Sequence, residues 1–292
     1  MSLLEAIFMG IVQGLAEFLP ISSSGHLAIF KYILKINTDT GLLFDVLLHL
    51  GTLLAVFAAF REDIRQLLTE GFAIIGNSFY NLFIRVKNLF SKNKTGYRKV
   101  ISTPYRRFVM LVIVSTIPTG ILGIVFEDVI EFSGTTLLIP GLFLILTAIL
   151  LMLADRVKTG NKDEQAASYK DAGLIGIAQG IATMPGLSRS GTTITACLLC
   201  GFDKSFAVKY SFIMSIPAVL GALLLELKDF RIAGTGGTQL LYYLIGTAVA
   251  GIIGYISIRT MLVIVRGRKF RFFAFYCMVI GLLAVIGQFT VA

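Results

Sequence analysis

One stretch of this sequence occurs twice, near the start of the chain and again beyond its middle. Residues 10–27 are GIVQGLAEFLPISSSGHL and residues 176–193 are GIAQGIATMPGLSRSGTT, and the two align without a gap. Each copy is a short apolar run, a Pro-containing break, a Ser-rich turn and a second apolar run. The repeat indicates that the protein consists of two related halves, and this constrains the fold more than any other feature.

Composition indicates a membrane protein. Hydrophobic residues make up 56% of the 292 residues and charged residues only 15%, and the mean hydropathy is +0.84. A water-soluble fold of this length does not need so much apolar sequence. The net charge of +9 is explained by basic loops on the cytoplasmic side of a membrane, so no nucleic-acid partner is expected. The first residues carry Glu5 and no basic run, so we expect this apolar segment to stay in the mature protein.

Six apolar segments are long enough to cross a bilayer, which takes about 20 residues. They are 41–60, 108–126, 135–154, 206–226, 238–258 and 270–290. Segments 4–35 and 172–202 each consist of two shorter arms around a break, and each predicts a re-entrant helical hairpin whose irregular backbone faces protein or a water-filled cavity. The predicted fold class is therefore an all-α polytopic membrane protein with six transmembrane helices and two re-entrant hairpins.

Both halves have the same order of segments, a hairpin followed by three spans. Residues 1–154 form the first predicted repeat and residues 171–292 the second. Because three is odd, the second half starts on the opposite face of the membrane, which predicts an inverted-topology repeat whose hairpin tips meet near the midplane.

Basic residues predict the orientation. Ten lie in loop 61–107, four in 155–170 and five in 259–271, whereas the other side has Lys31, Lys35, Lys228 and Arg231. The excess predicts that the three loops are cytoplasmic, with both termini outside. Within the insertion 61–107, residues 64–91 mix apolar and basic residues, which favours an interfacial helix on the inner leaflet.

Ionisable side chains inside a membrane are costly and are functional candidates for that reason. Glu17 lies in the first predicted hairpin, one helical turn after Gln13 and on the same face. The polar residues of the two breaks are the other candidates. They are Ser22, Ser23, Ser24, Gly25 and His26 in the first copy and Ser188, Arg189, Ser190, Gly191, Thr192 and Thr193 in the second.

These turns have the composition of anion sites. A Gly-flanked, Ser- and Thr-rich turn that opens a helix points free N–H groups at a ligand, and Arg189 adds a planar guanidinium that grips two phosphate oxygens. Two such turns, tip to tip, predict a diphosphate site. Each residue alone also fits close packing of membrane helices, so the prediction depends on their joint occurrence in the repeat.

Two further pairs of residues have open interpretations. Asp45 and His49 lie one turn apart on segment 41–60, where they either support the site or line a polar seam between helices. Cys197 and Cys200 form a CxxC inside an apolar run without a nearby His, so we favour packing over metal or redox chemistry.

At these residues the sequence resembles a known family, the undecaprenyl-diphosphate phosphatases of bacteria. The family carries a Glu/Gln-x-x-x-Glu motif, matched from Gln13 to Glu17, a following His, matched by His26, and Pro-Gly-x-Ser-Arg-Ser-x-x-Thr, matched from Pro185 to Thr193. The resemblance covers nearly the whole chain. It implies a location in the bacterial inner membrane and hydrolysis of undecaprenyl diphosphate to the monophosphate. It also implies recycling of this lipid carrier for peptidoglycan synthesis and resistance to bacitracin, which sequesters the diphosphate.

Our hypothesis for the chemistry is that Arg189 and the turn residues bind the phosphates while His26 acts as general acid or base. Glu17 orients His26, activates the nucleophile or holds Mg²⁺ or Ca²⁺. The nucleophile is Ser23, His26 or water, and we favour Ser23 activated through Glu17 and His26. The alternative function is a lipid-phosphate transporter that uses the same midplane site. A homo-oligomer is compatible with either.

Overall fold

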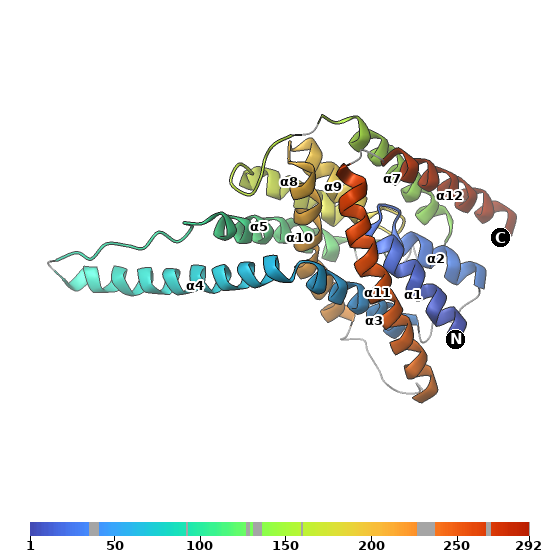
Figure 1. Ribbon diagram of the computed structural model, residues 1–292, viewed down its shortest axis with the longest axis horizontal. Helices are drawn as coiled ribbons and strands as arrows, with labels where there is room; N and C mark the ends of the chain where they lie inside the picture. The colour runs from blue at the N-terminus through green and yellow to red at the C-terminus, as the bar shows by residue number, and fades with distance from the viewer. Residues whose placement is uncertain are drawn as a thin grey trace.

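The computed structural model describes residues 1–34, 41–91, 93–126, 129–130, 136–158, 160–226, 237–266 and 270–291 (Figure 1). Named helices within these ranges are α1 (Leu3–Phe18), α2 (Ser23–Leu34), α3 (Gly41–Ala59), α4 (Arg61–Phe90), α5 (Pro104–Val125), α7 (Leu138–Arg156), α8 (Tyr169–Ile181), α9 (Arg189–Leu199), α10 (Lys204–Glu226), α11 (Gly237–Arg266) and α12 (Phe270–Val291). Apart from one isolated bridge between Lys162 and Phe202, the described residues contain no β-structure. The predicted all-α class is confirmed.

Long apolar helices make this a multi-pass membrane protein. Within the described ranges, α5, α7, α10, α11 and α12 are each long and apolar enough to cross a bilayer. Helices α3 and α4 pass the same test together, although the chain bends by 85° between them. All six predicted spans are thus helical. Residues 35 and 135, at the edges of two predicted segments, lie outside the described residues.

One predicted boundary is wrong. The sequence predicted a span over 238–258 and a basic turn over 259–271, but α11 continues to Arg266 and α12 begins at Phe270. Met261 and Val265 are buried on the additional helical turns, so packing of this apolar face extends the helix past the first basic residue of the predicted turn. Arg268 and Lys269 lie outside the described residues.

The two copies of the repeated stretch form the same local structure. Each is a helix, a break and a second helix, with the breaks at residues 19–22 and 182–188. In the first copy Ser22 Oγ accepts the Gly25 backbone N–H at 3.2 Å, and in the second Ser188 Oγ accepts the Gly191 N–H at 3.1 Å. A serine hydroxyl therefore satisfies a free N–H at the start of both α2 and α9. Re-entry of these pairs into the membrane, and the inverted order of the repeats, stay predictions.

Repeated glycines let the first helix of each pair pack closely on a long helix. Helix α1 lies against α11, and α8 lies against α5. A Cβ atom on Gly10 would lie 2.4 Å from the Gly246 carbonyl oxygen, and one on Gly176 would lie 2.2 Å from the Ser115 carbonyl oxygen. Gly10 and Gly176 are equivalent positions of the repeat, so the sequence identity preserves a helix contact in both halves.

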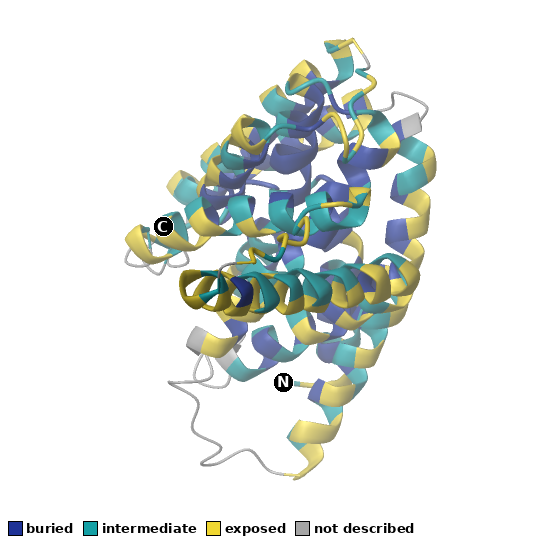
Figure 2. Ribbon diagram, turned by 90° about the vertical axis from the view of Figure 1, so that its left-hand side faces the viewer, coloured by how far each residue is buried: buried dark blue, intermediate teal, exposed yellow. Residues whose placement is uncertain are grey.

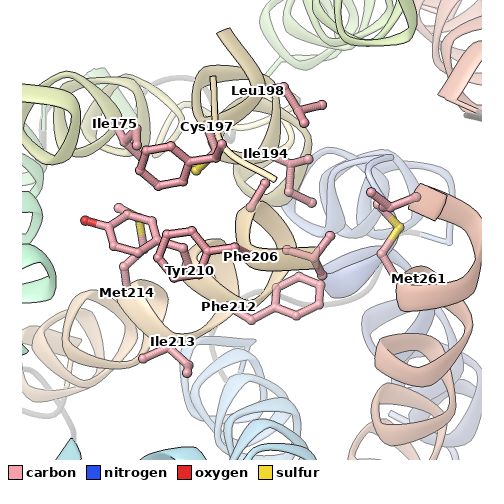
Figure 3. Close-up of a cluster of buried hydrophobic side chains, with 14 of the residues drawn as sticks. Ile175, Ile194, Cys197, Leu198, Phe206, Tyr210, Phe212, Ile213, Met214 and Met261 are labelled. Carbon is pink, nitrogen blue, oxygen red and sulfur yellow. The ribbon is translucent and has the colours of Figure 1, made fainter. Parts of the chain in front are cut away.

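The largest apolar core lies beside the second break. Buried residues gather inside the helical body (Figure 2), and Figure 3 shows Tyr210 and Phe212 of α10 near Ile194 and Cys197 of α9. Cys197 is fully buried with a free thiol, and Cys200 packs against the same cluster. The CxxC is thus a packing feature, as predicted.

Helix α4 lies outside the body formed by the other long helices (Figure 1). It projects from the helical body, with the following segment running back along it, and the two chain ends lie at the opposite side in Figure 1. Its 30 residues confirm the helix predicted over 64–91. Its placement on the inner leaflet stays a prediction.

Substitution at Gly176 tests the close approach of α8 and α5. We expect Gly176→Ala to lower the melting temperature in detergent by roughly 5 °C, because an overpacked helix contact costs about 1–3 kcal/mol. Gly173→Ala on the same helix is the matched control, since a Cβ there meets nothing within 4 Å. Equal melting temperatures for the two variants would contradict the packing described here.

Candidate active site

The Glu17 carboxylate is the centre of the polar cluster. It is buried and one of its oxygens, Oε2, accepts hydrogen bonds from the Gln13 amide at 3.1 Å and from the Ser23 hydroxyl at 2.5 Å. The other oxygen, Oε1, forms an ion pair with the Arg189 guanidinium. Glu17 therefore connects the end of α1, the start of α2 and the start of α9.

Small residues bring the two breaks into contact. A Cβ on Gly25 would lie 2.8 Å from the Gly186 Cα, and one on Gly191 would lie 3.2 Å from the Pro20 Cβ. Gly186 has a φ of +94°, a conformation that glycine adopts without steric cost. The two breaks therefore lie in close contact, at a separation where the guanidinium of the second reaches the carboxylate of the first.

His26 is held by groups other than Glu17 and Ser23. Its Nδ1 lies 2.8 Å from the Ser22 carbonyl oxygen, which only accepts, so Nδ1 carries a proton. Its Nε2 lies 2.8 Å from the hydroxyl of Tyr276 on α12, and the two rings stack at 5.5 Å with an interplanar angle of 6°. In the neutral ring, Nε2 accepts a hydrogen bond from the Tyr276 hydroxyl. Both ring nitrogens are thus engaged, and the expected chain from Ser23 through Glu17 to His26 is not formed in this structure.

Backbone strain lies at the same turn. Ser22 has a φ of +71°, which is uncommon for a residue with a side chain and costs of order 1–3 kcal/mol. This conformation directs its carbonyl to His26 and its hydroxyl to Gly25 and Ser24. The strain is concentrated where the imidazole is positioned.

The second break supplies donors to the cluster, with one exception. Ser188 lies within 3.4 Å of the Ser190 hydroxyl, and Ser190 donates to the Leu19 carbonyl oxygen of the first break at 3.4 Å. Thr193 instead turns its hydroxyl to Ser211 of α10, at 2.5 Å. Thr193, a predicted phosphate contact, therefore bonds α10 in this structure.

Several buried polar atoms of the cluster have no hydrogen-bond partner in the described part of the chain. They are Arg189 Nη1, Thr192 Oγ1 and Gln13 Oε1. Leaving such atoms unpaired costs about 1–3 kcal/mol each, so they are expected to bind a ligand or water. A guanidinium N–H and a hydroxyl are donors for an anion, and phosphate oxygens fit both.

Asp45 and His49 of α3 have separate surroundings. Asp45 pairs with Lys31 of α2, whereas His49 is close enough to Glu17 for an electrostatic interaction with it. His49 Nδ1 lies 2.9 Å from the Asp45 carbonyl oxygen, which orients the ring. His49 thus borders the cluster, while Asp45 connects α2 to α3.

The described residues offer a poor cation site. They contain no group of three or more His, Cys, Asp and Glu side chains that could hold a metal ion. Glu17 is the carboxylate of the cluster, both of its oxygens have partners, and the neighbouring position is the neutral Gln13. This donor set does not fit Mg²⁺ or Ca²⁺ held by the protein alone. Binding of either cation with the substrate present stays a prediction.

One residue of the cluster was absent from the sequence-based candidates. Tyr276 lies in the apolar run of α12, 250 residues from His26, and no local pattern marks it. Thr192, in contrast, aligns with His26 in the repeat, and this difference between the copies marked it as a candidate.

Comparison with known proteins identifies the family. The model of the family described as "Bacitracin resistance protein BacA" matches residues 6–283. The chain belongs to this family. It is 42% identical over 288 residues to the undecaprenyl-diphosphatase of Methanosphaera stadtmanae, covering 98% of both chains. It is 38% identical to the undecaprenyl-diphosphatase of Alkaliphilus metalliredigens, again covering 98% of both, and 39% identical to that of Halothermothrix orenii.

The buried ion pair predicts a specific pattern of stability. We expect Arg189→Met to destabilise the protein by about 3–5 kcal/mol, because it leaves the Glu17 carboxylate buried without its charged partner. Adding Glu17→Gln should restore part of this loss, as measured by thermal unfolding of the four proteins of the cycle in detergent.

An exposed ion pair provides the control. Arg61 pairs with Glu62 at 3.4 Å with most of both side chains exposed, so Arg61→Met should cost no more than about 1 kcal/mol. Additive effects of Arg189→Met and Glu17→Gln would contradict the pairing of these two residues.

Proposed function

We propose that this protein is an integral-membrane phosphatase that hydrolyses undecaprenyl diphosphate to undecaprenyl phosphate and inorganic phosphate. The proposal rests on the contacts of the Glu17 carboxylate. One oxygen accepts a hydrogen bond from the Ser23 hydroxyl, and the other pairs with the Arg189 guanidinium. A base, a hydroxyl nucleophile and a phosphate-binding cation are thereby in direct contact. Membership of the bacitracin resistance family and relatives named undecaprenyl-diphosphatase support the substrate.

The contacts suggest the order of chemical steps. Ser23 Oγ attacks the terminal phosphorus while its proton passes to Glu17 Oε2, to which it already donates at 2.5 Å. The bond from this phosphorus to the bridging oxygen breaks, and undecaprenyl phosphate leaves. In this first step the imidazolium form of His26, oriented by Ser22 and Tyr276, gives its Nε2 proton to the leaving oxygen. Water then attacks the phosphoserine and passes a proton to the now neutral His26, while Glu17 returns its proton to the departing Ser23 oxygen and inorganic phosphate is released.

Phosphate binding is assigned to the side chains and turns around Arg189. Its unpartnered Nη1 donates to the terminal phosphate as negative charge moves to the leaving oxygen. The hydroxyls of Ser188 and Ser190 and the turn at Gly191 surround the same anion, and Ser22, Ser24 and Gly25 surround it from the other break. Gln13 orients Glu17.

The membrane arrangement is part of the proposal. We place the protein in the cytoplasmic membrane with both termini outside, the two helix pairs re-entrant and the two repeats inverted. Three observations support this arrangement: equivalent serine caps in the two pairs, equivalent glycine contacts of α1 and α8, and contact of the two breaks. The prenyl chain lies along apolar grooves between helices. Recycling of the carrier lipid for cell-wall synthesis and bacitracin resistance follow from the reaction, since it removes the diphosphate that bacitracin binds.

Phosphate release by the purified full chain in detergent tests the activity. We expect Glu17→Gln, Ser23→Ala and Arg189→Lys each to lower kcat by at least about 100-fold. Ser257→Ala is the control, because this buried hydroxyl bonds only its own helix, at Ile253. Near-wild-type kcat in any of the three variants would remove the role given to that residue.

A labelling experiment identifies the nucleophile. Acid quenching during turnover of substrate that carries ³²P in its terminal phosphate should trap label on the wild-type protein and none on Ser23→Ala. Phosphate release without any trapped label would favour water as nucleophile. Movement of the lipid across liposomes without phosphate release would instead indicate the transporter, which no described contact favours over the enzyme.

The stacking of Tyr276 on His26 gives a prediction of its own. We expect Tyr276→Phe to lower kcat about 10-fold and leave KM within about twofold, because loss of a group that orients a catalytic residue typically costs 10–100-fold. Tyr255→Phe is the matched control, since the Tyr255 hydroxyl contacts Arg259 on the exposed side of α11. An unchanged kcat for Tyr276→Phe would show that this hydroxyl does not position His26.

A further inference from the structure

One face of α4 is attached to the rest of the chain. Near its start, Asp63 accepts the Tyr105 hydroxyl at 2.9 Å and pairs with Lys209 at 2.5 Å. Further along, the side chain of Asn81 exchanges two hydrogen bonds of 2.8 Å with the backbone of Arg98. Asn88 bonds Thr95 in the same way at 2.9 Å. The segment that returns to α5 therefore covers this face of α4.

The opposite face of α4 carries an exposed apolar stripe. Its residues follow one another at spacings of four and three, a 3.5-residue repeat that aligns them along one side of the helix. Each side chain is between 49% and 75% exposed. The residues of this apolar stripe are Leu68, Phe72, Ile75, Phe79, Leu82, Val86 and Leu89.

Two glycines flank the stripe at positions where no described neighbour requires a small residue. Gly71 and Gly76 adjoin it, and a Cβ at either position meets nothing within 4 Å. Neither has a positive φ among the described residues. A glycine inside a helix costs about 1 kcal/mol relative to alanine, so these two cost stability that no contact among the described residues explains. Close approach of another helix at the stripe accounts for both.

We propose that the apolar stripe of α4 binds the apolar stripe of a second copy of this chain, which makes the protein a dimer through its projecting helices. A two-fold pair uses the same surface on both copies, and the bulky side chains Phe72 and Phe79 then insert beside the glycines of the partner helix as knobs into holes.

The exposed area is sufficient for such a pair. At ~150–200 Å² for each large apolar side chain, the exposed fractions leave roughly 700 Å² per copy, and Phe83 and Phe90, which are 65% and 87% exposed, extend it. A standard interface buries about 800 Å² on each partner. An exposed surface of this size that continues along one helix marks an interaction site.

The residues beside the central part of the stripe favour a protein partner over the interfacial position on the inner leaflet that the sequence of residues 64–91 predicted. A helix that lies in the headgroup layer carries Lys and Arg beside its apolar face. In α4 there is no charged residue between Glu70 and Arg85, and the residues beside the central part of the stripe are Gly76 and Ser78. Acyl chains also gain nothing from glycine, whereas a packed helix does.

The mass of the full chain in detergent, corrected for bound detergent, tests the proposal. We expect twice the 31.8 kDa of one chain for wild type, and at least a 10-fold weaker association for Phe79→Glu. Gln66→Glu is the matched control, because it adds the same charge at an exposed position of α4 outside the stripe. Unchanged melting temperatures check that the variants are folded. A monomeric wild type, or a Phe79→Glu protein that stays dimeric, would overturn the proposal.

A fluorescence measurement separates the dimer from lipid contact. The chain has no tryptophan, so Phe79→Trp introduces a single probe into the stripe. In nanodiscs of brominated phospholipid we expect little quenching of this tryptophan, and strong quenching for Phe275→Trp, at an exposed position of the candidate span α12. Equal quenching at both positions would mean that the stripe contacts lipid, and would overturn the proposed partner.

Discussion

The ion pair between Glu17 and Arg189 is the interaction on which the site depends. Its partners are 172 residues apart in sequence and belong to different copies of the repeated stretch. A charged side chain buried in a membrane protein is costly unless it is paired, so each break requires the other. The pair therefore joins the two halves of the fold. It also holds the Glu17 carboxylate, the proposed base, next to the Arg189 guanidinium, the proposed phosphate-binding cation.

Packing also brings the two breaks together. Gly25 lies against Gly186 and Gly191 against Pro20, and a Cβ at either glycine would crowd its neighbour. The equivalent serine caps fix the direction in which α2 and α9 leave the breaks. Identical positions of the two copies, Gly25 with Gly191 and Ser22 with Ser188, thus contribute to the frame of both breaks. Positions that differ, such as Glu17 and Arg189, supply the chemistry.

Much of the fold could be predicted because its signals are local. Apolar runs, Pro- and Ser-containing breaks and the repeat gave all six long helices and both helix pairs, and the acid Glu17 and the cation Arg189 stood out from the apolar sequence around them. The partners of each side chain could not be predicted in the same way. His26 turns to Tyr276 and Thr193 turns to Ser211, and both partners lie on helices whose sequence pattern is that of an ordinary span. The end of α11 was missed for a related reason, since burial of Met261 and Val265 outweighs the basic residues that mark a loop.

The central claim is that the two breaks act as one catalytic unit, and a kinetic cycle on Glu17 and Arg189 tests it most directly. Phosphate release would be measured for wild type, Glu17→Gln, Arg189→Met and the double variant, each checked for folding. If the residues act together, the double variant will be about as slow as the slower single variant. If the two losses in kcat multiply, the residues act independently, and the account of a shared site would be contradicted.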